Sequence, residues 1–275
     1  MVGDSEGYIA TGVQTSYKDE ITGYNFVDGI YDIKKYGKGN DLQLTINAEL
    51  CATAYKALGK NKGTVGVYNY KTGELVCVVS SPSYDIQNKP TENINNDKTG
   101  AYEGVYLNRF FSGVYTPGST FKIITAAAAI DNIPDISEKT YKCTGEYKVG
   151  GSSVKCMARH GTVDSYAAQT TLMPQAMFSA STAKELQDLL RSNVKNYYGD
   201  SKFRGLEMCG KTGTAEVSSE EGGDKPHAWF VGYSQREDLP YAIVVVVENG
   251  GGGSSVAIPV ANKTMQKVED LYAEQ

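Results

Sequence analysis

A serine and a lysine stand three residues apart where the sequence predicts the start of a helix. The segment Gly113–Asp131 reads GVYTPGSTFKIITAAAAID, a proline-glycine turn followed by an alanine-rich run, with Ser119 and Lys122 at the junction. Residues i and i+3 of a helix share a face, about 5–6 Å apart. A serine becomes a nucleophile when a base takes its proton, and a lysine can be that base where burial or a second cation lowers its pKa. The pair therefore favours acyl transfer, with the free N–H groups of the helix start available to an oxyanion.

A second segment decides how much weight this pattern deserves, because serine is also a preferred N-cap and S-x-x-K alone commonly marks an ordinary helix start. The stretch GKTGTAE places Lys211, Thr212 and Gly213 in a predicted strand. A glycine there lets a substrate backbone approach closely, and the lysine offers its charge to a carboxylate. K-T-G alone says little, since it recurs at Lys71–Gly73 and Lys98–Gly100, where a hairpin and a loop are expected.

The apolar pattern predicts the elements that position these residues. We expect strands at 41–46, 63–70, 74–80, 206–217, 227–233 and 241–249, and helices at 47–58, from about 119, at 182–197 and at 255–271. The tetrapeptide KTGE predicts a hairpin between two of the strands, and Thr182 with Glu185 predicts a capping box. Short connections between the last strands favour an antiparallel sheet, so the expected fold class is α/β, of the α+β type.

Composition limits the partners of the chain. It has 275 residues with 40% apolar content, enough for one large domain or a domain with a small appendage, and a formal charge of −5. The acidic balance argues against nucleic acid as a partner. No apolar run approaches the roughly 18 residues of a membrane span, and Met1–Gly7 is polar, so we expect a soluble piece that meets a membrane only through a segment not present here.

Cysteine and histidine usage argues against a metal site. The five cysteines include no C-x-x-C, and there are only two histidines. Cys143 and Cys156 flank a polar, glycine-rich loop, and they could pair only in an oxidising compartment.

Several motifs in order resemble the transpeptidase domain of penicillin-binding proteins, and its class B members in particular. S-T-F-K after P-G, and K-T-G-T-A-E followed by H-A-W-F-V-G-Y, are the strongest of them. DLQLTINAEL, GTVGVYNYKTGELVCVVSSPSYD, NRFFSGVYTPGSTFK and CMARHGTVD are also similar to segments of that domain. The resemblance extends from Asp41 to about Asn249. It implies an antiparallel sheet of about five strands flanked by helices, with an α-helical subdomain.

The resemblance also implies a role for each motif residue. Ser119 would be the acylated nucleophile and Lys122 its base. Lys211 would complete the catalytic set and, with Thr212, bind the terminal carboxylate of the substrate. The backbone N–H groups of Ser119 and Thr214 would form the oxyanion hole.

The implied reaction is peptidoglycan cross-linking. The serine would attack a D-Ala-D-Ala stem peptide, release D-alanine and pass the acyl group to an amine of a neighbouring strand, and β-lactams would acylate the same serine. No metal or cofactor is implied, and no glycosyltransferase segment is visible. The expected location is the extracytoplasmic face of the bacterial cell membrane, where other cell-wall synthesis proteins are potential partners.

One motif of the family is missing. S-x-N or S-x-D should follow HGTVD on a loop, but neither occurs between Lys122 and Lys211. RSNV lies on a predicted helix that points its serine elsewhere, and Ser179 with Ser181 is the only stand-in we consider. We therefore divide the chain into a lead-in or remnant of another domain at 1–40 and a transpeptidase domain at 41–275 that lacks segments after about 164 and 181. Residues absent from the sequence in hand, deliberate shortening or natural loss would each explain this, and we favour the first.

Four other functions stay open at this point. A serine β-lactamase shares the two motifs but needs a deacylating base, and no E-x-x-L-N-like segment lies between them. A D,D-carboxypeptidase differs only in using water as acceptor. A non-catalytic or β-lactam-sensing relative could have lost the third motif. A Ser-His-Asp hydrolase fits least, because G-x-S-x-G is absent and His160 and His227 read as a loop and a strand-entry residue.

Overall fold

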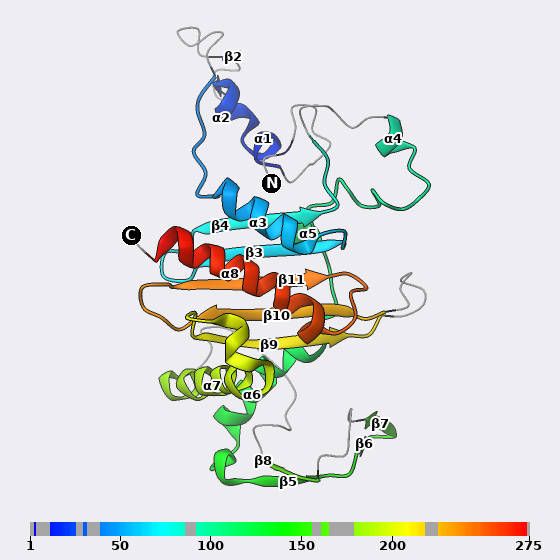
Figure 1. The fold of residues 1–275 in the computed structure, drawn as a ribbon, viewed down its shortest axis with the longest axis vertical. Coiled ribbons are helices and arrows are strands. Elements are labelled where there is room, and N and C mark those ends of the chain that lie inside the picture. The colour runs from blue at the N-terminus through cyan, green and yellow to red at the C-terminus, as the bar shows by residue number, and fades with distance from the viewer. Residues whose placement is uncertain are drawn as a thin grey trace.

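A five-stranded antiparallel sheet runs through the middle of the protein in the order β4-β3-β11-β10-β9 (Figure 1). The structure is a computed structural model that describes residue 3 and residues 12–25, 30–31, 39–85, 92–155, 161–164, 179–217 and 225–273. The strands are β3 (Gly63–Asn69), β4 (Leu75–Ser81), β9 (Met208–Ala215), β10 (His227–Ser234) and β11 (Tyr241–Val247). The fold class and the antiparallel five-stranded sheet expected from the sequence are confirmed.

Two helices cover one face of the sheet. These are α3 (Ala48–Leu58) and α8 (Ile258–Tyr272), which lie side by side across the strands (Figure 1). The main core lies beneath them, where β-branched residues of β3 and β11 meet apolar side chains of both helices. Its fully buried members include Leu50, Leu58, Val65, Val245 and Met265. A π-helical turn, η9 (Gly253–Ala257), leads into α8.

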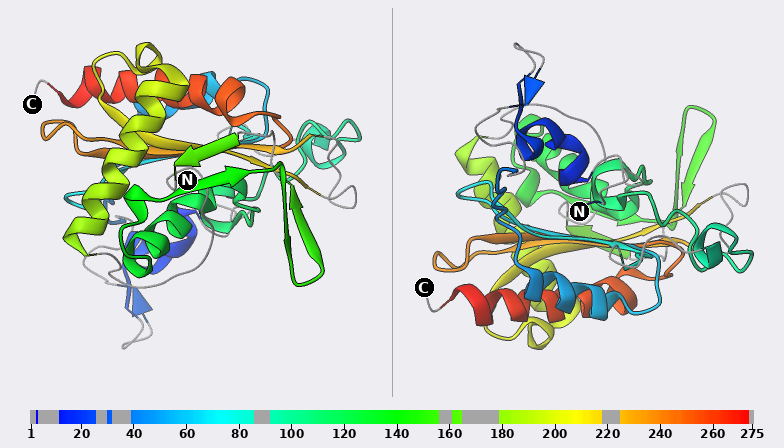
Figure 2. Two further views of the ribbon diagram at one scale, coloured as in Figure 1. Left: turned by 90° about the horizontal axis from the view of Figure 1, so that it is seen from below. Right: turned by 90° about the horizontal axis from the view of Figure 1, so that it is seen from above.

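The elements that carry the candidate site lie on the opposite face and at the β9 edge (Figure 2). A short helix, α5 (Arg109–Ser112), precedes the 3₁₀ turn η3 (Gly118–Phe121) and the helix α6 (Lys122–Asn132). Helix α7 (Ala180–Ser192) packs against α6 and continues into the π-helical η6 (Asn193–Gly199) and the 3₁₀ turn η7 (Asp200–Phe203), which leads to β9.

Smaller elements lie outside the sheet. They are α1 (Val13–Ser16), α2 (Lys18–Thr22), β1 (Tyr24–Asn25) with β2 (Ile30–Tyr31), α4 (Glu92–Asn95), η4 (Ile136–Glu138), β5 (Thr140–Cys143) with β8 (Gly161–Asp164), and β6 (Glu146–Val149) with β7 (Ser152–Lys155). Among the described residues, none of the helices combines the length and the apolar character needed to cross a bilayer.

Two expected elements differ from the structure. Residues 41–46 form no strand, because this segment bonds the sheet only near its end, where the Thr45 hydroxyl donates to the Leu75 carbonyl at 2.6 Å. The capping box at Thr182 is also wrong. Helix α7 starts earlier, and Ser179 is its N-cap, accepting from the Thr182 amide at 3.1 Å. The KTGE hairpin is confirmed, with Gly73 at φ 80° in the turn.

A glycine in β3 allows α5 to lie against the sheet. A methyl group at Gly66 would overlap the ring of Phe110. Gly66→Ala should therefore lower the free energy of unfolding by about 1–3 kcal/mol, measured by chemical denaturation. The double variant with Phe110→Leu should recover part of the loss, and a Gly66→Ala protein as stable as the wild type would contradict this packing.

Candidate active site

The turn that carries Ser119 is packed directly against strand β9. Gly118 has a positive φ of 55°, and a Cβ atom there would lie 2.9 Å from the Ala215 Cα and 3.0 Å from the Thr214 carbonyl oxygen. Only glycine fits both the conformation and the space. This contact fixes Ser119 beside Thr214, on the strand that carries K-T-G.

A second glycine makes the same approach possible from the strand. At Gly213 a Cβ atom would lie 3.0 Å from the Thr120 methyl carbon and 3.1 Å from the Pro117 carbonyl oxygen. The two sequence motifs, about ninety residues apart, thus meet through backbone. The structure brings together Ser119 and the Lys211–Thr214 stretch that the sequence assigned to one site.

Ser119 and Lys122 share one side of the chain but differ in exposure. Ser119 belongs to the 3₁₀ turn and Lys122 opens α6, and in a 3₁₀ turn residues i and i+3 eclipse. Ser119 is half-buried, whereas Lys122 is exposed. Among the described residues neither side chain has a hydrogen-bond partner. The burial that would favour a lysine base is therefore not present in the described structure.

Lys211 is held differently. Its half-buried ammonium donates to the Thr212 carbonyl at 3.0 Å and to the Tyr198 hydroxyl at 3.4 Å. No carboxylate neutralises Lys211 in the part of the chain that the structure describes. A partly enclosed cation with only neutral partners can accept an anionic group of a ligand.

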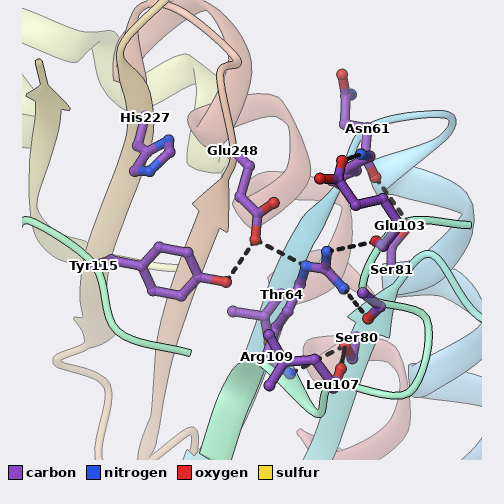
Figure 3. Close-up of polar contacts among 12 residues, drawn as sticks. Asn61, Thr64, Ser80, Ser81, Glu103, Leu107, Arg109, Tyr115, His227 and Glu248 are labelled. Atoms are coloured by element: carbon purple, nitrogen blue, oxygen red, sulfur yellow. Dashed lines mark hydrogen bonds and ion pairs between the residues drawn. The ribbon is translucent and has the colours of Figure 1, made fainter. Parts of the chain in front are cut away.

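An ion pair between the buried Arg109 and the half-buried Glu248 anchors the segment before Ser119 to the end of β11 (Figure 3). The Arg109 side chain is 4% exposed, and its Nε donates to a Glu248 carboxylate oxygen at 2.8 Å. The other guanidinium nitrogens donate to the Gly104 and Glu103 carbonyls at 2.8 and 3.1 Å. The charge-assisted pair joins α5 to the end of β11.

Tyr115 links this ion pair to the nucleophile loop. Its hydroxyl donates to the same Glu248 oxygen at 2.7 Å, and burial together with Glu248 raises the pKa of Tyr115 (Figure 3). Its ring meets Trp229 edge to face at 6.0 Å, and the Trp229 indole donates to the Thr116 carbonyl at 3.1 Å. The chain is thus held on both sides of Tyr115, four residues before Ser119.

Sequence reasoning did not assign these supporting residues. Glu248 was detectable, because a lone carboxylate ending the all-apolar run YAIVVVV needs a partner if it is buried. Arg109 stands in the quoted NRFF motif, but nothing local indicates that its partner lies 139 residues away. Tyr198 had no sequence signal, since it is one of 20 tyrosines and its contact with Lys211 arises from the π-helical turn.

Ser179 does not take the place of the missing third motif. Its hydroxyl caps α7 and contacts the Ser181 hydroxyl at 2.7 Å, while Thr182 bonds Asp131 near the end of α6. Asp131 is nine residues from Lys122, which is about 14 Å along a helix. Ser179 is therefore tied to the far end of α6.

The expected gaps fall on different parts of the chain. The segment directly after Asp164 and Cys156, the possible partner of Cys143, lie outside the described residues. The second gap was expected after about Ser181, where the described chain runs as a regular helix from Ala180 to Ser192.

Comparison with known proteins agrees with this geometry. The sequence matches the family "Penicillin binding protein transpeptidase domain" in two overlapping stretches, residues 63–177 and 160–266. The chain belongs to this family. It is 34% identical over 121 residues to a probable peptidoglycan D,D-transpeptidase FtsI of Caulobacter vibrioides, which is 42% of this chain and 19% of that protein. The chain spans about a fifth of the length of the curated relatives it matches.

Solved structures show the same fold. The D,D-transpeptidase domain of a peptidoglycan glycosyltransferase from Eggerthella lenta superposes with a TM-score of 0.76 at 18% identity, covering 98% of this chain and 91% of that one. Penicillin-binding protein A of M. tuberculosis, in a ceftriaxone acyl-enzyme complex, gives 0.75 at 18% identity, covering 94% and 87%.

We expect the ion pair of Arg109 and Glu248 to contribute strongly to the free energy of unfolding. Arg109→Met should lower the free energy of unfolding by about 3 kcal/mol, because Glu248 keeps an enclosed charge without its cation. Lys62→Met is the matched control. It breaks an ion pair whose Glu103 side chain is 76% exposed, and it should cost less than about 1 kcal/mol. Equal losses in urea denaturation would contradict the role given to Arg109.

Proposed function

We propose that this chain is the transpeptidase part of a peptidoglycan D,D-transpeptidase, with Ser119 as the residue that is acylated. One observation carries the proposal. The Ser119 turn is packed against β9, the strand that carries Lys211, Thr212 and Gly213, and this contact supports a site that combines the serine hydroxyl, backbone amides and the Lys211 ammonium. Family membership supports the same reaction class.

The proposed reaction has two halves. The Ser119 oxygen attacks the carbonyl carbon of the penultimate D-alanine while Lys122 takes its proton, and the Ser119 and Thr214 amides receive the oxyanion. The C–N bond breaks and terminal D-alanine leaves with the proton. An amine of a neighbouring strand then attacks the ester, forms the cross-link and restores the Ser119 hydroxyl.

Binding roles follow from the same geometry. Lys211 and Thr212 receive the terminal carboxylate of the stem peptide, and Gly213 lets the Ser119 turn lie close to the strand beside which the peptide binds. β-Lactams acylate Ser119, a step that the ceftriaxone acyl-enzyme of the M. tuberculosis relative supports. The domain acts at the extracytoplasmic face of the bacterial membrane, with other cell-wall synthesis proteins as partners and an anchor in a segment outside the sequence in hand.

We also propose that residues 41–275 form the transpeptidase domain, that 1–40 are a lead-in or a remnant of an N-terminal domain, and that the transpeptidase domain lacks segments after about 164 and 181. The two family matches overlap at 160–177, next to the place where the third motif is missing. This shortening and the exposure of Lys122 favour a second candidate, a relative that binds β-lactams but does not turn over peptides.

Covalent labelling tests the nucleophile. Incubation with benzylpenicillin should add one penicilloyl group to the intact protein, and Ser119→Ala should remove this adduct completely, because Ser119 is the only hydroxyl placed at the η3–β9 contact with a lysine three residues on. Peptide mapping locates the adduct. Labelling that persists at another serine would refute the assignment, and labelling without D-alanine release from a stem peptide would favour the second candidate.

Substitution by arginine separates the two lysines. Lys122→Arg should lose acylation nearly as fully as Lys122→Ala, because a guanidinium cannot give up its proton at accessible pH. Lys211→Arg should lose less than Lys211→Ala, because the charge that meets the carboxylate remains. Acylation rates from time-resolved mass spectrometry measure both pairs, and equal tolerance of arginine at the two positions would contradict these roles.

A further inference from the structure

Strand β9 lies at one edge of the five-stranded sheet. In the part of the chain that the structure describes, β9 pairs with β10 alone, so every second residue turns its N–H and C=O groups away from the sheet. Thr212 is one of these residues, because its amide bonds outside the sheet, and Thr214 follows with the same orientation. An extended ligand would add to this edge through these two residues.

At Thr212 the outward-facing backbone groups of β9 already have hydrogen-bond partners. The Tyr198 hydroxyl accepts from the Thr212 amide at 3.2 Å and from the Thr212 hydroxyl at 3.1 Å. Lys211 bonds the Thr212 carbonyl at 3.0 Å and reaches the same tyrosine oxygen at 3.4 Å. Both outward backbone groups of Thr212 are therefore occupied by side chains. We call this arrangement of Tyr198, Lys211 and Thr212 the edge clasp.

The clasp lies at a defined distance from the nucleophile. Ser119 is beside Thr214, and two strand residues span about 7 Å. In a ligand that runs antiparallel to β9, the residue with the reacting carbonyl lies opposite Thr214 and the leaving residue opposite Gly213. The next residue would need the Thr212 amide, which Tyr198 already occupies. A carboxylate at that point instead meets the ammonium of Lys211.

We propose that Tyr198 limits the leaving group to one residue with a free carboxylate. This specificity role rests on the proposed function, because it takes Ser119 as the acylated residue. Tyr198 is half-buried and its ring packs against the main core, so the hydroxyl is held in place and a ligand does not readily displace it. Tyr198 positions Lys211 and occupies the Thr212 amide at the strand edge. It does not touch the reacting atoms.

Two probes read this role directly. The first is benzylpenicillin, and the second is its glycine amide, in which the carboxylate lies one residue further along the chain. The wild type should be acylated at least about tenfold faster by the first, the equivalent of one charge-assisted hydrogen bond lost. Tyr198→Phe keeps the ring and frees the Thr212 amide, so the ratio of the two rates should fall at least about threefold. Tyr197→Phe is the matched control, since the Tyr197 side chain is 80% exposed and the ratio should not change.

Amide exchange tests the clasp independently of acylation. In protein labelled with ¹⁵N-threonine, the Thr212 amide should exchange at least about tenfold faster in Tyr198→Phe than in the wild type, and Tyr197→Phe should leave it unchanged. Unaltered exchange would refute the clasp.

The possible failures are distinguishable. A wild type that forms no adduct with benzylpenicillin would refute the proposed function and the specificity role together. An adduct at Ser119 with the same rate ratio in wild type and Tyr198→Phe would refute only the role of Tyr198.

Discussion

The close approach of the Ser119 turn to strand β9 is the constraint on which the rest of the site depends. Gly118 and Gly213 allow backbone to meet backbone where side chains would keep the elements apart. Without this contact the serine and the K-T-G strand would be two ordinary features, a helix start and an edge strand. With it, the turn that carries Ser119 lies against the K-T-G strand, an arrangement that supports the proposed oxyanion hole.

A contact made of backbone needs support from elsewhere, because glycines add flexibility and no packing of their own. The support is the ion pair of the buried Arg109 with the half-buried Glu248, and Tyr115 connects this pair to the loop that carries Ser119 (Figure 3). Such a pair stabilises little compared with apolar residues of the same shape, but it is directional, and losing one partner leaves the other charge enclosed. The arrangement therefore fixes where the loop lies more than how stable the fold is.

The sequence predicted those parts of the fold whose signal is local. The strands β3, β4, β9, β10 and β11 and the helix after Ser119 follow from apolar runs and turn residues. The expected strand at 41–46 failed because its alternation is not matched by a neighbouring strand, and the capping box failed because Ser179 offers an earlier cap. Ser119 and Lys211 were assigned from their motifs, and the structure brings the two segments that carry them into contact. Tyr198 and the pairing of Glu248 could not be assigned in this way, because both contacts depend on where distant segments meet.

The two lysines of the candidate site differ in how firmly the structure positions them, and this difference affects the chemistry that each can do. On the β9 side, Lys211 is fixed by the edge clasp, whereas Lys122 is exposed and has no hydrogen-bond partner among the described residues. A β-lactam brings a strained amide that demands less help in the first attack, while a relaxed peptide needs the base in both halves of the reaction. In the proposed reaction the β9 side supplies recognition of the carboxylate, and Lys122 supplies the base that both β-lactam acylation and cross-linking need.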